Sequence, residues 1–295
     1  MPAEARTVQK SPVDDAQRRT ISLTTGTIEY TDTGGDGPTI VFLHGLLMDR
    51  SLWGAVIAEL SPGNRCIAPT LPLGAHREAM TPDADLSLEG IATLVGQLLD
   101  ELDLRDATVA GVDTGGALLQ LLMARREPRL ARAILISCDA FDNFPPGLTG
   151  KTLVAAGKLP PTLFNFFMQH LRFRPIRRSP LAFGWLTKRG DRATQLWLEP
   201  VLKQPEIRRD TLRVLRAITA NRKLLLDTAE HLPSFDRPSL VIWAERDRVM
   251  PPEHGERLAG LLPQSRLVVL ADSRTLIPLD QPTRLAQHIN SFMCA

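Results

Sequence analysis

Short apolar runs recur along the chain, and helix-like segments separate them from the middle of the N-terminal half onward. The clearest runs are rich in β-branched residues and end in polar residues or glycine: TIVFLHG (39–45), ATVAGVD (107–113), RAILISCD (132–139) and SLVIWAERD (239–247). Continuous apolar strands that alternate with helices are typical of parallel sheets covered on both faces. The pattern therefore predicts an α/β protein with a doubly wound, mostly parallel sheet.

Polar residues with candidate chemistry stand at the ends of these runs. His44-Gly45, the hexapeptide GVDTGG (111–116), Asp139 and Asp247 each close an apolar run. The carboxyl ends of parallel strands meet along one edge of a sheet, where α/β proteins bind their ligands. We therefore expect these residues to gather at one site.

Residues 140–232 break the alternation of strands and helices. This segment contains several helical stretches together with Trp185 and Trp197. It predicts a mostly helical cap inserted into an α/β core that consists of residues 20–139 and 233–295.

Two charged segments are expected to lie at the surface. Residues 1–19 carry charges of both signs and no apolar stretch, which predicts a polar tail and no secretory signal. The basic run RFRPIRR (172–178) in the cap is expected to be a solvated surface, with a site for an anionic substrate as the alternative.

Composition narrows the classes of partner. The 295 residues are 43% hydrophobic and 23% charged with a net charge of +2, which gives no case for nucleic-acid binding. Cys66, Cys138 and Cys294 are scattered, so no disulfide framework or zinc motif is expected. No apolar run approaches the ~20 residues that span a bilayer. We expect a cytoplasmic monomer or homodimer that acts on a small-molecule substrate, with no cofactor, metal, membrane or nucleic-acid partner.

The hexapeptide GVDTGG has the spacing of a nucleophile elbow, G-x-S-x-G, with Asp113 in the serine position. Gly111, Gly115 and Gly116 provide the small residues that such a tight strand-to-helix turn needs. The turn places the central side chain at a helix N-terminus, where partial positive charge favours an anion. Asp113 is therefore a candidate nucleophile or general base, and a simple helix N-cap is the alternative.

Over residues 20–295 the chain resembles the α/β-hydrolase superfamily, on the strength of VFLHG, GVDTGG, WAERDRVMPPEHGERLA and PLDQPTRLAQHINSFM. Within the superfamily it looks most like the branch with an aspartate nucleophile, which includes haloalkane dehalogenases and epoxide hydrolases. It is also similar to a group of actinobacterial proteins with a G-x-D-T-G-G elbow. The resemblance implies an α/β-hydrolase fold with a helical cap, and it specifies the fold more than the reaction.

The resemblance also implies roles for further residues. The backbone N–H groups of Leu46 and Thr114 correspond to an oxyanion hole. Asp247 corresponds to the carboxylate that orients a catalytic histidine, with Asp139 as a second candidate. For both aspartates a turn or cap at a strand end is the alternative. His44, which precedes glycine, is expected to be structural.

The superfamily pattern breaks at the histidine. Alignment on IPLDQP puts Thr275 in the histidine position, and no histidine occurs between His254 and His288, which we expect at the surface. In an aspartate-nucleophile hydrolase this histidine activates the water that cleaves the ester intermediate. Without it the first step can occur, whereas the second is expected to stall unless another group serves as the base.

Other residues are candidates to complete the site. His76 in PTLPLGAHREAM is a candidate proton carrier and Arg77 a candidate anion contact, with a mobile surface loop as the alternative for both. The single tyrosine, Tyr30, lies in an early strand, so the lid tyrosines of epoxide hydrolases have no counterpart. Trp185 and Trp197 are candidate substrate contacts, and packing within the cap is the alternative.

Three hypotheses follow from these residues. The first is an α/β-hydrolase-fold enzyme, a hydrolase, that acts on a small and fairly apolar substrate through Asp113. The second is a lyase, isomerase or cyclase in which Asp113 is a general base, which needs no histidine to release an intermediate. The third is a binding protein that retained the fold without catalysis.

Overall fold

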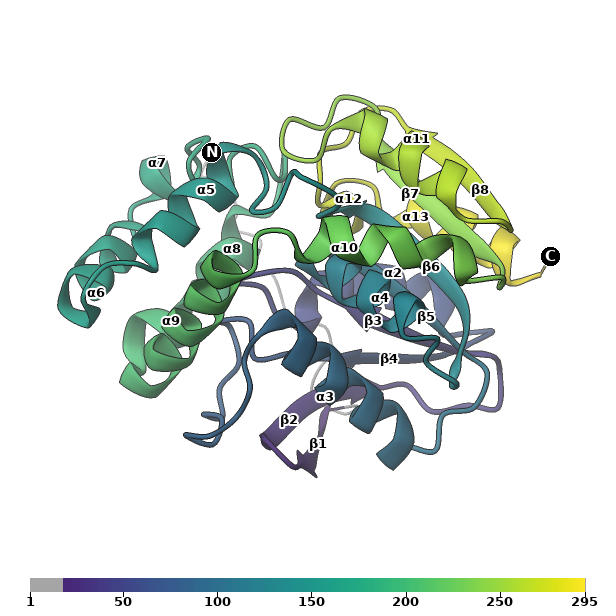
Figure 1. Cartoon of the computed structure of the whole chain (residues 1–295), viewed down its shortest axis with the longest axis horizontal. Coiled ribbons are helices and arrows are strands. Elements are labelled where there is room, and N and C mark those ends of the chain that lie inside the picture. Colours follow the sequence, from purple (N-terminus) through teal and green to yellow (C-terminus); the bar gives the residue numbers. More distant parts are fainter. Residues whose placement is uncertain (1–17, 295) are drawn as a thin grey trace, which may run out of the picture.

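The computed structural model describes residues 18–294, in which an eight-stranded sheet lies beside a helical cap (Figure 1). The strands are β1 (Arg18–Leu23), β2 (Gly26–Asp32), β3 (Thr39–Leu43), β4 (Arg65–Pro69), β5 (Ala107–Asp113), β6 (Leu130–Cys138), β7 (Ser239–Ala244) and β8 (Ser265–Leu270). Their order in the sheet is β1-β2-β4-β3-β5-β6-β7-β8. β2 pairs antiparallel with β1 and β4, and the other pairs are parallel. The predicted doubly wound, mostly parallel sheet is therefore confirmed.

The place of each strand in the sheet explains its sequence. Every residue of β5 and β7 is buried, and β3 and β6 are buried over most of their length. A strand with helices on both faces has no solvent side, so its sequence is continuously apolar. All exposed positions of the eight strands lie in the outermost strands β1 and β8.

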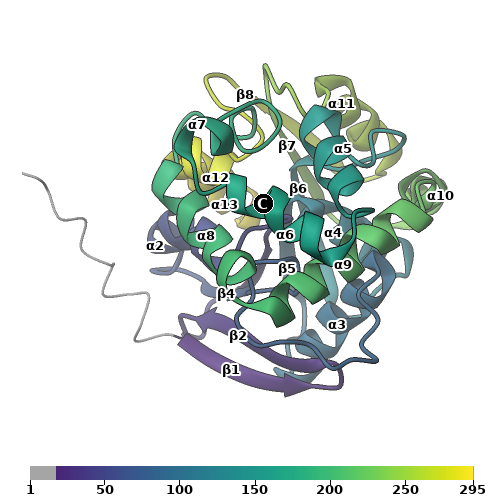
Figure 2. The same cartoon turned by 90° about the vertical axis from the view of Figure 1, so that its left-hand side faces the viewer.

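Helices cover the sheet in two layers. The core helices are η1 (Arg50–Trp53), α2 (Gly54–Leu60), α3 (Leu88–Glu101), α4 (Thr114–Ala124), α11 (Pro252–Leu261), α12 (Ile277–Asp280) and α13 (Pro282–Met293). α2 packs against α13 and α3 packs against α4, and Figure 2 shows these two pairs on opposite sides of the sheet. The helix α3 shows the local signals well. Ser87 caps it by accepting a hydrogen bond from the N–H of Gly90, and its buried apolar residues repeat at helical spacing.

The segment between β6 and β7 forms the cap. Its helices are α5 (Gly147–Ala156), α6 (Pro161–His170), α7 (Arg174–Arg177), α8 (Asp191–Lys203), α9 (Pro205–Ala220), α10 (Leu224–His231) and η2 (Leu232–Ser234). The helices α5 to α9 gather at one end of the molecule (Figure 1). The last long helix of the segment, α10, packs on α4 of the core.

The predicted polar tail, residues 1–19, falls almost wholly outside the described residues. Its last two residues, Arg18 and Arg19, belong to β1, where they pair with Thr31 and Tyr30 of β2. The strand β1 therefore begins inside the segment that was expected to be tail.

Strand register brings the candidate residues to one edge of the sheet. Leu43 at the end of β3 lies opposite Gly111 of β5, and Asp113 at the end of β5 lies opposite Cys138 of β6. The segments that follow these three strands therefore start side by side. This edge is where a doubly wound sheet places its functional groups.

The turn after β5 leaves no room for side chains at its glycines. A Cβ atom on Gly115 would lie 2.3 Å from the carbonyl oxygen of Leu43, and one on Gly116 would lie 2.2 Å from the Cβ of Cys138. Both distances are far below van der Waals contact. The glycines therefore allow α4 to start directly against β3 and β6.

We predict that Gly115→Ala lowers the free energy of unfolding by about 2–3 kcal/mol, because the added methyl group collides with backbone atoms. Gly260→Ala is the matched control, since Gly260 lies near the end of α11 with open space around it. Alanine there should be neutral or stabilise by about 0.5–1 kcal/mol. Denaturant unfolding measures both variants, and equal stabilities would contradict the crowding inferred at the turn.

Candidate active site

Asp113 ends β5 in a backbone conformation that is rare for any residue except glycine. Its φ is 55° and its ψ is −131°, and its side chain is buried with 5% exposure. Such a conformation costs about 1–3 kcal/mol and persists only where the surroundings impose it. It is the conformation expected of the central residue of a nucleophile elbow, which directs the side chain above the sheet.

One carboxylate oxygen of Asp113 is held by the predicted oxyanion-hole amides. Oδ1 accepts hydrogen bonds from the N–H of Thr114 at 2.7 Å and from the N–H of Leu46 at 3.3 Å. A Cβ atom on Gly45 would lie 2.3 Å from Oδ1, so this close approach requires glycine after His44. The contact with Leu46 distinguishes Asp113 from a simple helix N-cap, which bonds only its own helix. Oδ2 of Asp113 accepts no hydrogen bond from residues 18–294.

Asp139, which follows β6, lies on the far side of the Thr114 hydroxyl. Thr114 Oγ1 is 3.0 Å from Oδ1 of Asp113 and 3.0 Å from Oδ2 of Asp139, but it has one proton to donate. Burial raises the pKa of Asp139 well above its ordinary value, and the charge of Asp113 raises it further. A protonated Asp139 fits the geometry, because it donates to Thr114, whose hydroxyl then donates to Asp113. The three residues form a hydrogen-bonded chain that ends at the Asp113 carboxylate.

Asp247, the predicted acid, follows β7 and is bonded to the residue aligned with the usual histidine. Its Oδ1 accepts the N–H groups of Val249 at 2.9 Å and Met250 at 3.0 Å, and the hydroxyl of Thr275 at 2.8 Å. Thr275 is fully buried. The structure therefore places a hydroxyl group, not an imidazole, against this carboxyl.

Three buried aspartates thus share the site without a cationic partner. No lysine, arginine or histidine within residues 18–294 forms an ion pair with Asp113, Asp139 or Asp247. Burial raises the pKa of Asp113, hydrogen bonds from Thr114 and Leu46 oppose the rise, and the charge of Asp247 adds to it. Burial likewise raises the pKa of Asp247. Within the same residues, no group of three or more His, Cys, Asp and Glu side chains is arranged to hold a metal ion.

His44 supports the backbone beside the site. Its Nδ1 lies 2.9 Å from the carbonyl oxygen of Gly45, and its Nε2 accepts the N–H of Leu71 at 2.8 Å. Burial lowers its pKa to about 4, so the ring is neutral at physiological pH and can accept this bond. The ring therefore joins the loop after β3 to the loop after β4, which fits the structural role expected for it.

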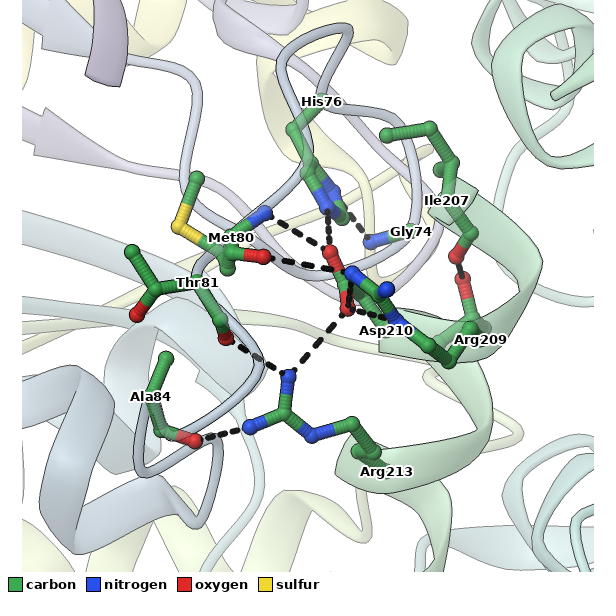
Figure 3. Close-up of polar contacts among 10 residues, drawn as sticks. Gly74, His76, Met80, Thr81, Ala84, Ile207, Arg209, Asp210 and Arg213 are labelled. Atoms are coloured by element: carbon green, nitrogen blue, oxygen red, sulfur yellow. Dashed lines mark hydrogen bonds and ion pairs between the residues drawn. The ribbon is translucent and has the colours of Figure 1, made fainter. Parts of the chain in front are cut away.

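His76 is buried but lies outside this arrangement. Its Nε2 is 3.5 Å from Oδ2 of Asp210 on the cap helix α9, and its Nδ1 accepts the N–H of Gly74 at 3.3 Å (Figure 3). His76 is also absent from the lining of the cavity beside Asp113. The interpretation of His76 as a proton carrier therefore has no support in the geometry.

The cluster around Asp210 fastens the cap to the core. Asp210 also accepts the N–H of Met80 at 2.8 Å and contacts the guanidinium groups of Arg209 at 3.1 Å and Arg213 at 3.3 Å (Figure 3). These two arginines in turn donate to backbone carbonyls of residues 80–84. The cluster lowers the pKa of Asp210 through hydrogen bonds from His76, Met80 and Arg209, against the opposing effect of burial.

A small cavity of about 50 Å³ opens beside Asp113. Core residues Leu46, Thr114 and Asp139 line it on one side, and the remaining wall is mostly apolar: Phe144, Pro145, Pro146, Thr149, Gly150, Leu153, Val154, Leu186, Ile218 and Val249. A second apolar cavity of about 50 Å³ lies next to it and shares four of these residues: Leu46, Thr149, Leu153 and Leu186. Typical ligand sites measure roughly 300–1,000 Å³, so a substrate must be small or must displace part of the cap.

The other candidate substrate contacts lie elsewhere. Arg77 is partly exposed and faces Glu29 at 3.8 Å, and Trp197 donates from Nε1 to Ser51 at 2.9 Å. Trp185 is half-buried in the packing of the cap. None of these three residues lines either cavity.

The cavity wall is what sequence reasoning missed. Its residues come from α5, from α9 and from the loops after β6, α7 and β7, which the sequence does not bring together. The one available signal was AFDNFPPG, an apolar and proline-rich stretch directly after the strand that carries Asp139.

Comparison with known proteins agrees with this architecture. A family model described as alpha/beta hydrolase fold matches residues 38–282. The matched region contains the strands from β3 to β8, the segment 111–116 and the whole cap.

Several individual proteins share parts of the sequence or the fold. A haloalkane dehalogenase of Mesorhizobium japonicum is 36% identical over 120 residues, which are 40% of this chain and 38% of that protein. The match therefore spans well under two thirds of that relative. Haloalkane dehalogenase 2 of Mycobacterium bovis is 26% identical over 273 residues and covers 90% of each chain. A solved structure of a thermophilic esterase from Thermogutta terrifontis superposes with a TM-score of 0.70 at 24% identity, over 94% of this chain and 98% of that one.

We predict that Asp139→Asn stabilises the protein at pH 8 but not at pH 4. The pKa of the Asp139 carboxyl group is higher in the folded protein than in the unfolded chain, so the unfolded chain loses the carboxyl proton at lower pH. The free energy of unfolding therefore falls as pH rises from about 4 through the pKa of the folded protein. Asparagine cannot ionise and its amide can still donate to Thr114. We expect a gain on the order of 1 kcal/mol at pH 8, measured by denaturant unfolding at both pH values.

Asp36→Asn is the control for this measurement, because Asp36 is an exposed loop carboxyl. Its stability should follow that of the unmodified protein at both pH values. An Asp139→Asn variant that is less stable than the unmodified protein at pH 8 would show that Asp139 is ionised in the folded state.

Proposed function

The chain belongs to the alpha/beta hydrolase fold family, and from this premise we propose that it is a hydrolase whose Asp113 attacks an electrophilic carbon of a small, apolar substrate. One observation carries the proposal: Oδ1 of Asp113 is anchored by two amides, and Oδ2 has no hydrogen-bond partner within residues 18–294. A carboxylate held in this way presents one oxygen to the cavity in a fixed orientation.

The first step requires only groups that are already in place. Oδ2 of Asp113 forms a bond to the substrate carbon, and the leaving group departs with the electrons of the broken bond. The product is an ester in which Oδ1 is the carbonyl oxygen, still bonded to the amides of Leu46 and Thr114. These amides would stabilise the negative charge that develops on Oδ1 when water attacks the ester carbon.

The second step lacks its usual base. The position that would hold a histidine is Thr275, whose hydroxyl is a poor proton acceptor and already donates to Asp247. Esterification removes the charge of Asp113, which is one of the causes of the raised pKa of Asp139. Asp139 is therefore the carboxyl closest to taking over as base, and hydrolysis of the ester is expected to be slow.

A second function is favoured by the chain of hydrogen bonds from Asp139 through Thr114 to Asp113. The raised pKa of Asp113 makes it a stronger base than an exposed aspartate. In this alternative Asp113 removes a proton from the substrate and no ester forms, which corresponds to a lyase, isomerase or cyclase reaction.

We predict a mass adduct on Asp113, an alkyl ester of its carboxyl group, after exposure of the protein to short alkyl halides. Its rate of formation should fall at low pH with a midpoint above ~3.9, because only the ionised carboxylate attacks and its pKa is raised. Intact-protein and peptide mass spectrometry measure the adduct, and Asp113→Asn is the control. Substrate turnover that never yields an adduct would favour the general-base alternative. If neither an adduct nor turnover is detected, both proposed roles of Asp113 are contradicted.

We predict that Thr275→His shortens the lifetime of this adduct by about a hundredfold or more, the usual contribution of a positioned general base. A ring nitrogen at residue 275 can bond to Asp247 in place of the hydroxyl. Thr275→Val, which removes the hydroxyl at constant volume, should leave the lifetime unchanged. Adduct decay is measured by mass spectrometry, with melting curves to confirm that both variants fold; equal lifetimes for the two variants would contradict the missing-base explanation.

A further inference from the structure

Exposed apolar side chains are concentrated on the cap. Within residues 18–294, seven of the eight large hydrophobic side chains that are exposed belong to the cap: Leu148, Leu163, Phe166, Phe173, Ile176, Leu181 and Leu196. The eighth, Val269, lies on the edge strand β8. Phe166 and Phe173 are 66% and 62% exposed. Exposure of such large apolar side chains to water is unfavourable, and a cluster of them indicates a binding surface.

Positive charge is concentrated on the same segment. Residues 140–232 contain 16 of the 35 lysines and arginines but 7 of the 33 aspartates and glutamates. The cap therefore has an excess of nine positive charges, whereas the whole chain has a net charge of +2. The remainder of the chain must be acidic, and the molecule is strongly polarised toward the cap.

The apolar and basic groups are interleaved around α6. This helix packs against α8 and α9, and Figure 2 shows it facing the viewer at the centre of the cap. A groove of about 430 Å³ between α6 and α9 is lined by Arg208, Arg209, Arg213 and Arg216. A second groove of about 480 Å³ beside α8 is lined by Arg172, Arg177 and Lys203, with Glu199 as its acidic residue. The helix α6, which carries the exposed Leu163 and Phe166, contributes to the first groove, and the residues directly after it contribute to the second.

The basic run of the cap has the same interleaved character. Residues 172–176, Arg-Phe-Arg-Pro-Ile, are exposed without interruption. The sequence alone predicted a solvated surface here, but an exposed phenylalanine and isoleucine between arginines are poorly suited to water. Apolar and basic side chains are favourable together at a bilayer surface, where hydrocarbon chains adjoin anionic headgroups.

An apolar route leads from this surface toward Asp113. The second cavity is lined by Leu181, which is 49% exposed, together with Phe167 and Leu171. At its other end it is lined by Leu46 and Leu153, which also line the cavity beside Asp113. A lipophilic molecule that leaves a bilayer at Leu181 would reach the site between apolar side chains.

We propose that the outer face of the cap, made of α6, α7 and the exposed side chains around them, docks on the surface of an anionic lipid bilayer. Phe166, Phe173 and their neighbours insert among the lipids, and the exposed Arg172 and Arg174 beside them contact lipid phosphates. Among the helices of residues 18–294, none combines the length and apolar character needed to cross a bilayer. A second copy of the chain is a poorer occupant, because two equally basic faces repel each other.

This inference revises the sequence-based expectation that there is no membrane partner. Docking itself does not depend on the proposed chemistry of Asp113. The passage of an apolar substrate from the bilayer to the site rests on that proposed function.

The test is co-sedimentation of the full-length protein with vesicles, in the absence of any substrate. Vesicles contain either phosphatidylcholine alone or a mixture with phosphatidylglycerol. We expect binding to the anionic vesicles that weakens as salt is added. Phe166→Ser with Phe173→Ser should reduce the affinity by about tenfold or more, as expected for two partly inserted aromatic rings.

Val269→Ser is the matched control, because Val269 is 52% exposed but lies on β8 outside the cap. It should leave vesicle affinity unchanged. Arg172→Gln with Arg174→Gln should weaken binding to anionic vesicles and flatten its dependence on salt. Melting curves in the absence of lipid confirm that each variant folds.

Four outcomes would overturn the proposal. One is no binding to anionic vesicles, and another is equal binding by the double phenylalanine variant. A third is dimerisation in the absence of lipid that the double variant abolishes, which would identify a second copy as the occupant. The fourth is tighter binding to RNA than to vesicles, with no effect of the phenylalanine substitutions. Because substrate is absent, a failure of the Asp113 chemistry would leave this measurement unaffected.

Discussion

The hydrogen bonds from the amides of Leu46 and Thr114 to one oxygen of Asp113 set the geometry of the site. They require Asp113 to take a positive φ, Gly45 to lack a side chain, and β3 and β5 to be neighbours in a fixed register. The carboxyl group held in this way also lines the cavity beside it. The same amides that hold the carboxylate would hold the charge of an ester under attack by water.

This arrangement concentrates carboxyl groups where charge is poorly solvated. Asp113, Asp139 and Asp247 are buried together, and burial raises the pKa of each. The Thr114 hydroxyl bridges Asp113 and Asp139, and the Thr275 hydroxyl donates a hydrogen bond to Asp247. Burial of the apolar strands around the site stabilises the fold and offsets the destabilising effect of the buried carboxyl groups.

The cap connects this buried site with the outside of the molecule. Its helix α9 is fixed to the core through Asp210 (Figure 3), whereas exposed apolar and basic side chains lie on and around α6 and α7. The apolar cavity lined by Leu46 and Leu181 lies between these two regions. One inserted segment therefore closes the site, lines it with apolar groups and gives the protein a polarised surface.

The sequence by itself determined the sheet, the elbow and the insertion, because these depend on local patterns: a continuously apolar β5, glycines around Asp113, and helical spacing between β6 and β7. It also indicated Leu46 and Thr114, since they adjoin recognisable strand ends. Only the tertiary structure decided that Asp139 reaches Asp113 through Thr114, that Thr275 bonds to Asp247, and that His76 faces Asp210 across 134 residues of sequence. These contacts depend on strand register and side-chain direction between distant segments, which no local pattern encodes.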